Sequence, residues 1–233
     1  MKTTMISSQH ALEAIFQHKK LAIFDLDGTL IDSEPIYAKG WQQALANYGF
    51  EISEETLQRM TGQSIQTNNK VIQAIVGEET IVQHVRQLRE DYYYRALERG
   101  EIHLVAGSRD FLQQFANQSL TMAVASASKK EKVMKTLSTL GIKDYFVQVM
   151  AGDEVQLSKP DPEIYLRVLK KMNGTAEEAI AFEDSLSGVK SSTNAGITTL
   201  VVGDNGDTII KELSSQQYSY IGGRIVSFSD ILG

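Results

Sequence analysis

The sequence predicts an α/β fold, in which helices cover a parallel sheet and a separate helical unit is inserted near the start of the chain. Short apolar runs alternate with amphipathic stretches through the second half, a pattern typical of parallel sheets with right-handed crossovers. Between residues 34 and 103, apolar residues recur at helical spacing and no convincing strand interrupts them. We therefore expect a core domain of residues 1–33 and 104–233 and a helical domain of residues 34–103.

Length and composition limit the classes of function. The chain has 233 residues, 42% of them hydrophobic, which is enough for one ordinary domain and a smaller one. A net charge of −6 without a basic cluster argues against nucleic-acid binding, and the absence of cysteine excludes disulfides and thiol chemistry. No apolar run reaches the ~18 residues that span a bilayer, and residues 1–20 lack the apolar segment of a signal peptide. We expect a cytoplasmic protein that binds no membrane.

The first predicted elements are a short helix over residues 8–17 and a buried strand that starts at Leu21. The apolar run that ends at Phe24 is too short for a helix and leads directly into Asp25 and Asp27. Positions two apart on a strand share a face, so both carboxylates can lean toward one site. Because two close carboxylates repel each other unless a cation or a proton lies between them, the stretch indicates a Mg²⁺ site.

Four helices are expected between residues 34 and 103. Pro35 suits the first turn of the first helix, and Gly49 closes that segment. Ser53 is placed to cap the second helix, and the fourth ends at Gly100. We interpret the aromatic residues here as helix packing. The residues at helical spacing are Tyr37, Trp41, Leu45 and Tyr48 in the first helix, Ile65, Ile72 and Ile75 in the third, and Ile81, Val85, Leu88, Tyr92 and Ala96 in the fourth.

Residues that can cap helices divide the second half of the chain into further elements. Ser108 and Ser128 are each placed to cap a helix, and Asp161 precedes a proline that suits a first helical position. Thr175 and Glu178 have the spacing of a capping box. Apolar runs predict strands over residues 120–125, 145–151, 179–182 and 198–202, and one short strand in the tail.

Three of the predicted strands end in polar residues. Asp25 follows the first, Ser126 follows a later one, and Glu183 and Asp184 follow another. Ligands bind at the carboxyl edge of open parallel sheets, so these groups should converge there. Lys159 lies in a segment stiffened by two prolines just before a capped helix. Carboxylates, a cation, a hydroxyl and an ammonium in one pocket suit phosphoryl transfer, because the phosphoryl oxygens carry charge that must be neutralised.

Each of these signals has a simpler interpretation when taken alone. The aspartate pair is compatible with turn chemistry, and Ser126 with an ordinary loop hydroxyl. Lys159 by itself is typical of a solvated surface lysine, and Glu183 with the following aspartate is typical of a helix start. The four histidines have no ligand spacing. The functional interpretation therefore depends on the motifs occurring together and in order.

Taken together, the motifs resemble those of the haloacid dehalogenase superfamily of Mg²⁺-dependent phosphotransferases. The likeness is greatest to the β-phosphoglucomutase-like phosphatase subgroup with a helical (C1) cap, and it covers roughly residues 20–202. It implies a Rossmann-like parallel sheet core with an inserted α-helical cap domain over residues 34–103. The motifs that carry the resemblance are Asp25-Leu26-Asp27-Gly28-Thr29, Ser126, Lys159 and Glu183-Asp184-Ser185.

The resemblance also implies roles for the acidic residues. Asp25 would be the nucleophile that forms an aspartyl-phosphate, and Asp27 would be the general acid and then the general base. Mg²⁺ would be held by the Asp25 carboxylate, the backbone carbonyl of Asp27 and the Asp184 carboxylate, while Glu183 would shape the surrounding shell. Lys159 would neutralise charge on the nucleophile and on the phosphoryl group.

The same resemblance implies the substrate contacts and partners. Ser126 would be catalytic by binding the phosphoryl oxygens, and Ala127, Thr29 and Gln63 would complete the substrate site. The partner would be a small phosphorylated metabolite, and no nucleic acid is expected. We expect a monomer, with a homodimer as the alternative.

Departures from the mutases bear on the reaction. The arginine and the histidine that the mutases carry in the cap fall at Ile65 and Tyr37 here. The basic residue of the fourth cap helix is displaced, with Leu88 in its place and Arg86 or Arg89 nearby. A mutase must hold a second phosphate with fixed cationic donors, so the sequence favours hydrolysis of sugar or polyol phosphates. The alternatives are a sugar-phosphate mutase, a dehalogenase, a phosphonate hydrolase using Lys39 or Lys70, and a non-catalytic phosphate-binding module.

Overall fold

The computed structural model describes residues 4–6, 8–63, 65–118 and 120–232. It divides into two compact units, one of Met1–Ile31 with Leu104–Gly233 and one of Asp32–His103. The sequence places the first boundary after residue 33, beside the observed division after Ile31. That the second unit acts as a cap stays a prediction. Within the described ranges, no helix has the length and apolar character needed to cross a membrane.

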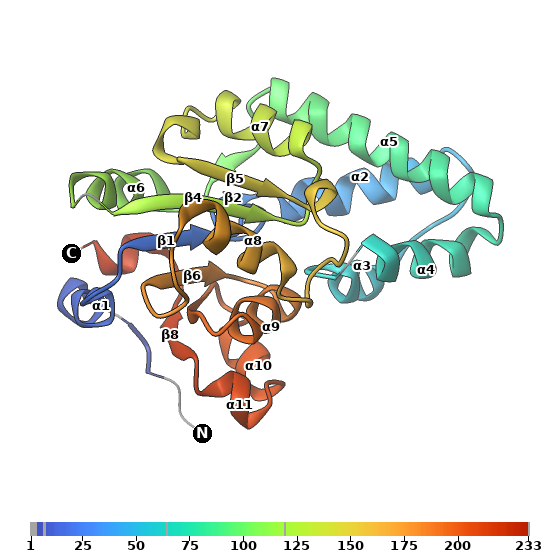
Figure 1. The fold of residues 1–233 in the computed structure, drawn as a ribbon. Coiled ribbons are helices and arrows are strands. Elements are labelled where there is room, and N and C mark those ends of the chain that lie inside the picture. Colours follow the sequence, from blue (N-terminus) through green and yellow to red (C-terminus); the bar gives the residue numbers. More distant parts are fainter. Residues whose placement is uncertain (1–3, 7, 64, 119, 233) are drawn as a thin grey trace. The chain divides into compact units, whose positions relative to one another are not determined.

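A six-stranded sheet forms the centre of the first unit (Figure 1). All its pairs are parallel, as the sequence predicts for an α/β fold, and the strand order is β5-β4-β1-β6-β7-β8. β5 is shorter than the predicted strand because residues 143–145 form a 3₁₀ turn, η1. The strands are β1 Leu21–Phe24, β4 Thr121–Ser126, β5 Gln148–Ala151, β6 Ala179–Glu183, β7 Thr198–Val202 and β8 Ile221–Ile225.

Helices flank this sheet in the alternating order that the sequence predicts, and the tail contains more structure than the one strand expected there. The α-helices of the first unit are α1 Gln9–Phe16, α6 Ser108–Asn117, α7 Lys130–Thr139, α8 Glu163–Met172, α9 Leu186–Asn194, α10 Gly206–Lys211 and α11 Ser215–Tyr218. The 3₁₀ turns are η1 Lys143–Tyr145, η2 Gly152–Glu154 and η3 Phe228–Ile231.

The two faces of the sheet are packed by different residues. Alternation along β1 sends Leu21 and Ile23 to the face covered by α8, where they join alanines of β4 and β6. Phe24 points to the other face and stacks on Phe182 of β6 with ring centroids 4.6 Å apart. Phe111 of α6 packs edge-on against that pair. Small side chains on the α8 face therefore leave room for the groups described below.

α6 begins with Ser108 itself, so the prediction that Ser108 caps this helix is wrong. The preceding Gly107 has a φ of 80°, and a Cβ there would lie 2.3 Å from the backbone nitrogen of Ser229. Only glycine fits such a turn. The Ser108 hydroxyl donates instead to the carbonyl of Leu30 at 3.3 Å, which ties α6 to the segment after β1.

Three other predicted caps also differ from the structure. α7 begins two residues after Ser128, whose hydroxyl has another partner. The N–H of Thr175 donates to Glu178 Oε2 at 3.4 Å, but no helix follows and the chain enters β6 directly. This side-chain bond closes a turn. At the start of α8, Pro162 and not Asp161 occupies the N-cap position, and Asp161 accepts from the backbone N–H of Glu163 at 2.9 Å.

The second unit contains the four helices that the sequence predicts. Ser53 caps the second of them by accepting from the backbone N–H of Thr56. The interpretation of the aromatic residues as packing is supported for Trp41 and Tyr93, which are buried. The helices are α2 Glu34–Ala46, α3 Glu54–Met60, α4 Ile65–Val76 and α5 Glu79–Glu98.

A separate two-stranded sheet was not predicted. It pairs β2 (Ile31–Asp32) with β3 (His103–Leu104). Strands of two residues are too short to show an alternating pattern, so the sequence carries no periodic signal for them.

Candidate active site

Asp25 and Glu183 leave neighbouring strands at the same level of the sheet. β1 and β6 run parallel with Phe24 opposite Phe182, and the backbone N–H of Asp25 donates to the carbonyl of Phe182 at 3.0 Å. Because side chains alternate along a strand, both carboxylates lie on the face that α8 covers. Both are buried, with 8% of Asp25 and 0% of Glu183 exposed.

Lys159 joins these two carboxylates. Its Nζ donates to Asp25 Oδ1 at 2.6 Å, to Glu183 Oε1 at 2.5 Å and to the carbonyl of Ala125 at 2.9 Å. Ala125 belongs to β4, so one buried ammonium group links residues of β4, β1 and β6, which are adjacent in the sheet. An ammonium carries three N–H donors, and all three have an acceptor here. The charge of Lys159 is therefore held in one place beside Asp25.

The loop that carries Lys159 is itself anchored on both sides. Before it, Glu163 Oε2 accepts from the backbone N–H groups of residues 156 and 157, at 3.0 and 2.7 Å. After it, the Ser191 hydroxyl donates to the carbonyl of Asp161 at 2.6 Å. These bonds fix the backbone on either side of the lysine, so its long side chain enters the site from a defined direction.

A third side chain reaches Glu183, and sequence reasoning missed it. The Tyr165 hydroxyl on α8 donates to Glu183 Oε1 at 2.5 Å, and its ring lies 5.4 Å from Lys159 Nζ. Tyr165 belongs to the apolar stripe of α8, which signals burial. That stripe carries no information on the partner of the hydroxyl, because the partner depends on how α8 packs over β6.

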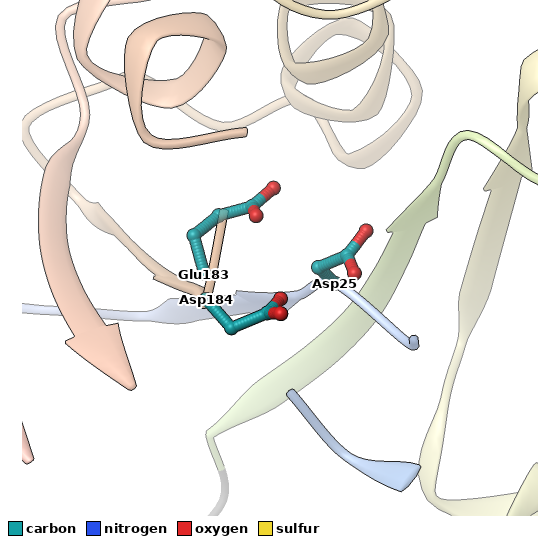
Figure 2. Close-up of side chains that lie close together, drawn as sticks. All are labelled: Asp25, Glu183 and Asp184. Carbon is teal, nitrogen blue, oxygen red and sulfur yellow. The ribbon is translucent and has the colours of Figure 1, made fainter. Parts of the chain in front are cut away.

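Asp184 completes a group of carboxylates that could hold a metal ion. One oxygen each of Asp25, Glu183 and Asp184 lies within 4.8 Å of the others, and Figure 2 shows the Asp184 carboxylate turned toward Asp25. The Thr29 hydroxyl donates to Asp184 Oδ1 at 2.9 Å. A Cβ on Gly28 would lie 2.0 Å from Asp184 Oδ2, so the approach of this carboxylate requires glycine.

The donor chemistry of this group fits Mg²⁺. Three carboxylates face a single ammonium group, which leaves negative charge that a divalent cation can neutralise. Mg²⁺ prefers oxygen ligands and is held in proteins by one or two carboxylates. The residues present therefore suit the metal that the sequence predicts.

Burial dominates the electrostatics of the site. Burial raises the pKa of Asp25 to about 8; Lys159 opposes this shift, while Glu183 and Asp27 add to it. Burial alone would lower the pKa of Lys159, but the Asp25 and Glu183 carboxylates raise it above its ordinary value. Burial and the neighbouring Glu183 raise the pKa of Tyr165 well above its ordinary value. Lys159 and Tyr165 thus keep their protons at neutral pH.

Asp27 has a partner that the sequence analysis assigned to a helix cap. The Ser128 hydroxyl donates to Asp27 Oδ2 at 3.0 Å. The backbone N–H of Ser128 donates in turn to the hydroxyl oxygen of Ser126, which is buried at the end of β4. Ala127 lies exposed between these two serines. In the loop after β4, the Ser128 side chain therefore binds Asp27, the predicted acid/base residue, and the Ser128 backbone binds Ser126.

Gln63 is the predicted substrate contact outside the first unit. It lies exposed after α3, and its backbone N–H donates to the carbonyl of Met60 at 3.2 Å. Its role stays a prediction. Ser64, the next residue in the sequence, lies outside the described residues.

Comparison with known proteins identifies the family. Residues 22–202 match the family model of haloacid dehalogenase-like hydrolases. The chain belongs to this family. The predicted likeness to its β-phosphoglucomutase-like subgroup is confirmed.

Named relatives of this haloacid dehalogenase-like chain include phosphatases. It is 29% identical over 179 residues to a phosphorylated carbohydrates phosphatase of Thermotoga maritima, covering 75% of this chain and 81% of the relative. It is 32% identical over 179 residues to a phosphoglycolate phosphatase of Yersinia pestis, covering 74% and 76%. The β-phosphoglucomutase structure from Clostridium difficile shares the fold, with a TM-score of 0.72, 20% identity and coverage of 90% and 92%.

Proposed function

We propose that this chain is a Mg²⁺-dependent phosphatase that hydrolyses small phosphate monoesters through an aspartyl-phosphate intermediate. The observation that carries the proposal is the buried cluster of Asp25, Lys159 and Glu183, with Asp184 completing a metal-binding group of carboxylates. The phosphatases named among the relatives support the same reaction class.

In the proposed first step, a carboxylate oxygen of Asp25 forms a bond to phosphorus while the bond from phosphorus to the ester oxygen breaks. Asp27 gives its proton to the leaving alcohol. In the second step Asp27 takes a proton from water, which attacks phosphorus and releases inorganic phosphate with a free Asp25 carboxylate. Splitting the displacement into two steps is the advantage of a covalent intermediate.

The other residues of the cluster stabilise charge in this scheme. Lys159 sits 2.6 Å from Asp25 Oδ1 and offsets negative charge on the nucleophile and on the phosphoryl oxygens. Asp25 and Asp184 would hold Mg²⁺ together with the backbone carbonyl of Asp27. When bound, Mg²⁺ supplies positive charge that offsets the phosphoryl oxygens and keeps Asp25 ionised. Ser126 and Thr29 would place hydroxyls near the phosphoryl group.

For the substrate we propose a sugar or polyol phosphate. Hydrolysis is favoured over mutase action because two arginines of α5, Arg86 and Arg89, have partners within the second unit. Arg86 donates to Asn69 Oδ1 at 2.9 Å, and Arg89 pairs with Glu90 at 2.7 Å. Ile65, in the place of the mutase arginine, is an exposed apolar side chain. A second phosphate would need free, fixed cationic donors.

Phosphate release from a panel of sugar, polyol, glycolate and nucleotide phosphates tests the proposal. Wild-type protein should release phosphate with Mg²⁺ and not after treatment with EDTA. Asp25→Asn should abolish release, because an amide oxygen is a poor nucleophile. Asp144→Asn, an exposed acid in η1, is the matched control and should keep full activity. Full activity in Asp25→Asn would refute the nucleophile assignment.

The same panel separates the alternatives. Interconversion of sugar phosphate isomers without net phosphate release would indicate a mutase. No turnover of any ester, together with tight binding of a phosphorylated ligand, would indicate a non-catalytic binding module.

A further inference from the structure

The apolar surroundings of residue 165 require only an aromatic ring, yet this residue is a tyrosine. It is fully buried among apolar residues of β1, β4 and β6 on the α8 face of the sheet. A buried hydroxyl costs free energy unless it finds a partner, and phenylalanine would fill the same space without that requirement. The hydroxyl meets this requirement by donating to Glu183 Oε1 at 2.5 Å, its one acceptor among the described residues.

The two oxygens of Glu183 are in very different surroundings. Oε1 receives two donors, the Tyr165 hydroxyl and the Lys159 ammonium, each at 2.5 Å. Oε2 is buried with no hydrogen-bond partner among the described residues. It packs against Gly188, where a Cβ would lie 1.8 Å away. This carboxylate is therefore held on one oxygen by two donors and on the other by close packing.

Asp25 and Glu183 compete for the same ammonium group. Lys159 lies 2.6 Å from Asp25 and 2.5 Å from Glu183, so its charge is divided between the nucleophile and a neighbour that does not react. A hydroxyl donor on Glu183 Oε1 supplies part of the stabilisation that this carboxylate would otherwise draw from Lys159. The ammonium is then available to Asp25 and to the phosphoryl group.

We propose that Tyr165 is a positioning residue, which by donating to Glu183 keeps the Lys159 ammonium on Asp25 during phosphoryl transfer. This inference rests on the proposed phosphatase function. The proposal also gives different roles to the adjacent acids Glu183 and Asp184. Asp184 would hold the metal, whereas Glu183 would act mainly as the partner of Lys159.

The first test is Tyr165→Phe, which removes one oxygen and keeps the ring. With p-nitrophenyl phosphate and saturating Mg²⁺, kcat should fall about tenfold. KM should stay unchanged, because the fully buried hydroxyl does not touch substrate. The matched control is Tyr145→Phe, whose hydroxyl donates to Gln113 Oε1 at 2.9 Å on the surface, and it should keep the wild-type kcat. An unchanged kcat in Tyr165→Phe overturns the proposal.

A double-mutant cycle with Glu183→Gln separates positioning from a purely structural role. If Tyr165 acts through Glu183, Tyr165→Phe should lower kcat in the wild-type background and have almost no further effect beside Glu183→Gln. Equal effects in both backgrounds would overturn the proposal. Should Glu183→Gln fail to fold, Glu183→Asp takes its place in the cycle, because the shortened carboxylate also withdraws from the hydroxyl.

The outcomes also separate this inference from the proposed function. If wild-type protein hydrolyses no phosphate ester, the proposed function fails. If wild type is active, Asp25→Asn is inactive and Tyr165→Phe matches wild type in kcat, only the role of Tyr165 fails.

Discussion

Two cations, the buried Lys159 of the first compact unit and the half-buried Arg89 of the second, are stabilised in opposite ways. Lys159 has 5% of its side chain exposed and contacts the carboxylates of Asp25 and Glu183. Arg89 has 11% exposed and lies over two aromatic rings, at 4.6 Å from the centre of Tyr37 and 4.8 Å from that of Trp41, with Glu90 as its ion-pair partner. The first cation sits among negative charges, and the second sits on π faces.

The different surroundings of Lys159 and Arg89 show at which of the two places unbalanced charge is left for a ligand. Around Lys159, three carboxylates face one ammonium, and the excess negative charge suits a divalent cation. Around Arg89, one carboxylate and two ring faces lie against the guanidinium, while its Nε has no hydrogen-bond partner among the described residues. The excess negative charge therefore lies at the core site, where the proposed phosphoryl transfer would take place.

The largest expected effect comes from removing the first cation. Lys159→Met should lower kcat about 10³-fold, since the charge beside the proposed nucleophile, Asp25, is lost. It should also lower the free energy of unfolding by about 3–5 kcal/mol in metal-free protein, because Asp25 and Glu183 stay buried without their partner. Steady-state kinetics and urea unfolding measure the two effects.

Lys20→Met is the control for this variant. Lys20 pairs with Glu178 at the surface, with 75% and 32% of the two side chains exposed. Loss of this pair should change the free energy of unfolding by less than about 1 kcal/mol and leave kcat intact. Equal effects of the two lysine variants would contradict the distinction between buried and surface cations.

A pH dependence should follow from the burial of Asp25. In metal-free protein its pKa is about 8, against an ordinary value of 3.8, because burial disfavours the carboxylate. Between these values the folded state binds more protons than the unfolded state, so the free energy of unfolding should decrease as pH rises. Urea unfolding in EDTA from about pH 5 to about pH 8 measures this slope.

Asp25→Asn should flatten that slope, since the titrating group is gone. Saturating Mg²⁺ should flatten it too, because the cation favours the ionised carboxylate in the folded protein. A wild-type stability that rises with pH over this range in EDTA would contradict the assignment to Asp25.

A smaller effect is expected from Ser128→Ala. The variant removes the hydroxyl that donates to Asp27 Oδ2 at 3.0 Å and so weakens the positioning of the proposed acid/base residue. We expect kcat to fall about tenfold, the size typical of one donor to a charged group. Ser219→Ala, whose hydroxyl donates to the carbonyl of Gln216 at the surface, should keep its activity. Identical kinetics for both serine variants would show that Asp27 does not depend on Ser128.

The smallest effect should come from the second cation. Arg89→Met keeps an unbranched side chain in place and removes the charge over Tyr37 and Trp41. It should lower the free energy of unfolding by about 1 kcal/mol and leave hydrolysis of p-nitrophenyl phosphate unchanged. Arg99→Met, at an exposed pair with Glu101, is the control for a surface arginine. A large loss of activity in Arg89→Met would mean that the helical cluster takes part in the reaction.

Much of the fold could be predicted from local patterns. The apolar runs at β1, β4, β6 and β7 and the helical spacing between residues 34 and 103 are properties of neighbouring residues, and the structure has the elements they predict. The helix caps show the limit of this reasoning. Ser53 accepts from a helix N–H as predicted, whereas Ser108 and Ser128 bind distant partners instead. A serine before a helix can cap that helix or bind a distant group, and which of the two it does depends on its tertiary surroundings.

The residues of the site divide in the same way. Local sequence patterns were enough to place the candidate site residues at strand ends or before a helix, because strand ends and helix starts depend on neighbouring residues. These residues are Asp25, Asp27, Lys159, Glu183 and Asp184. The tertiary structure decided that Ser128 holds Asp27 across 101 residues and that Tyr165 holds Glu183. Such contacts depend on the order of strands in the sheet and on how α8 packs over it. Those arrangements minimise the free energy of the whole chain and leave no periodic signal in any one segment.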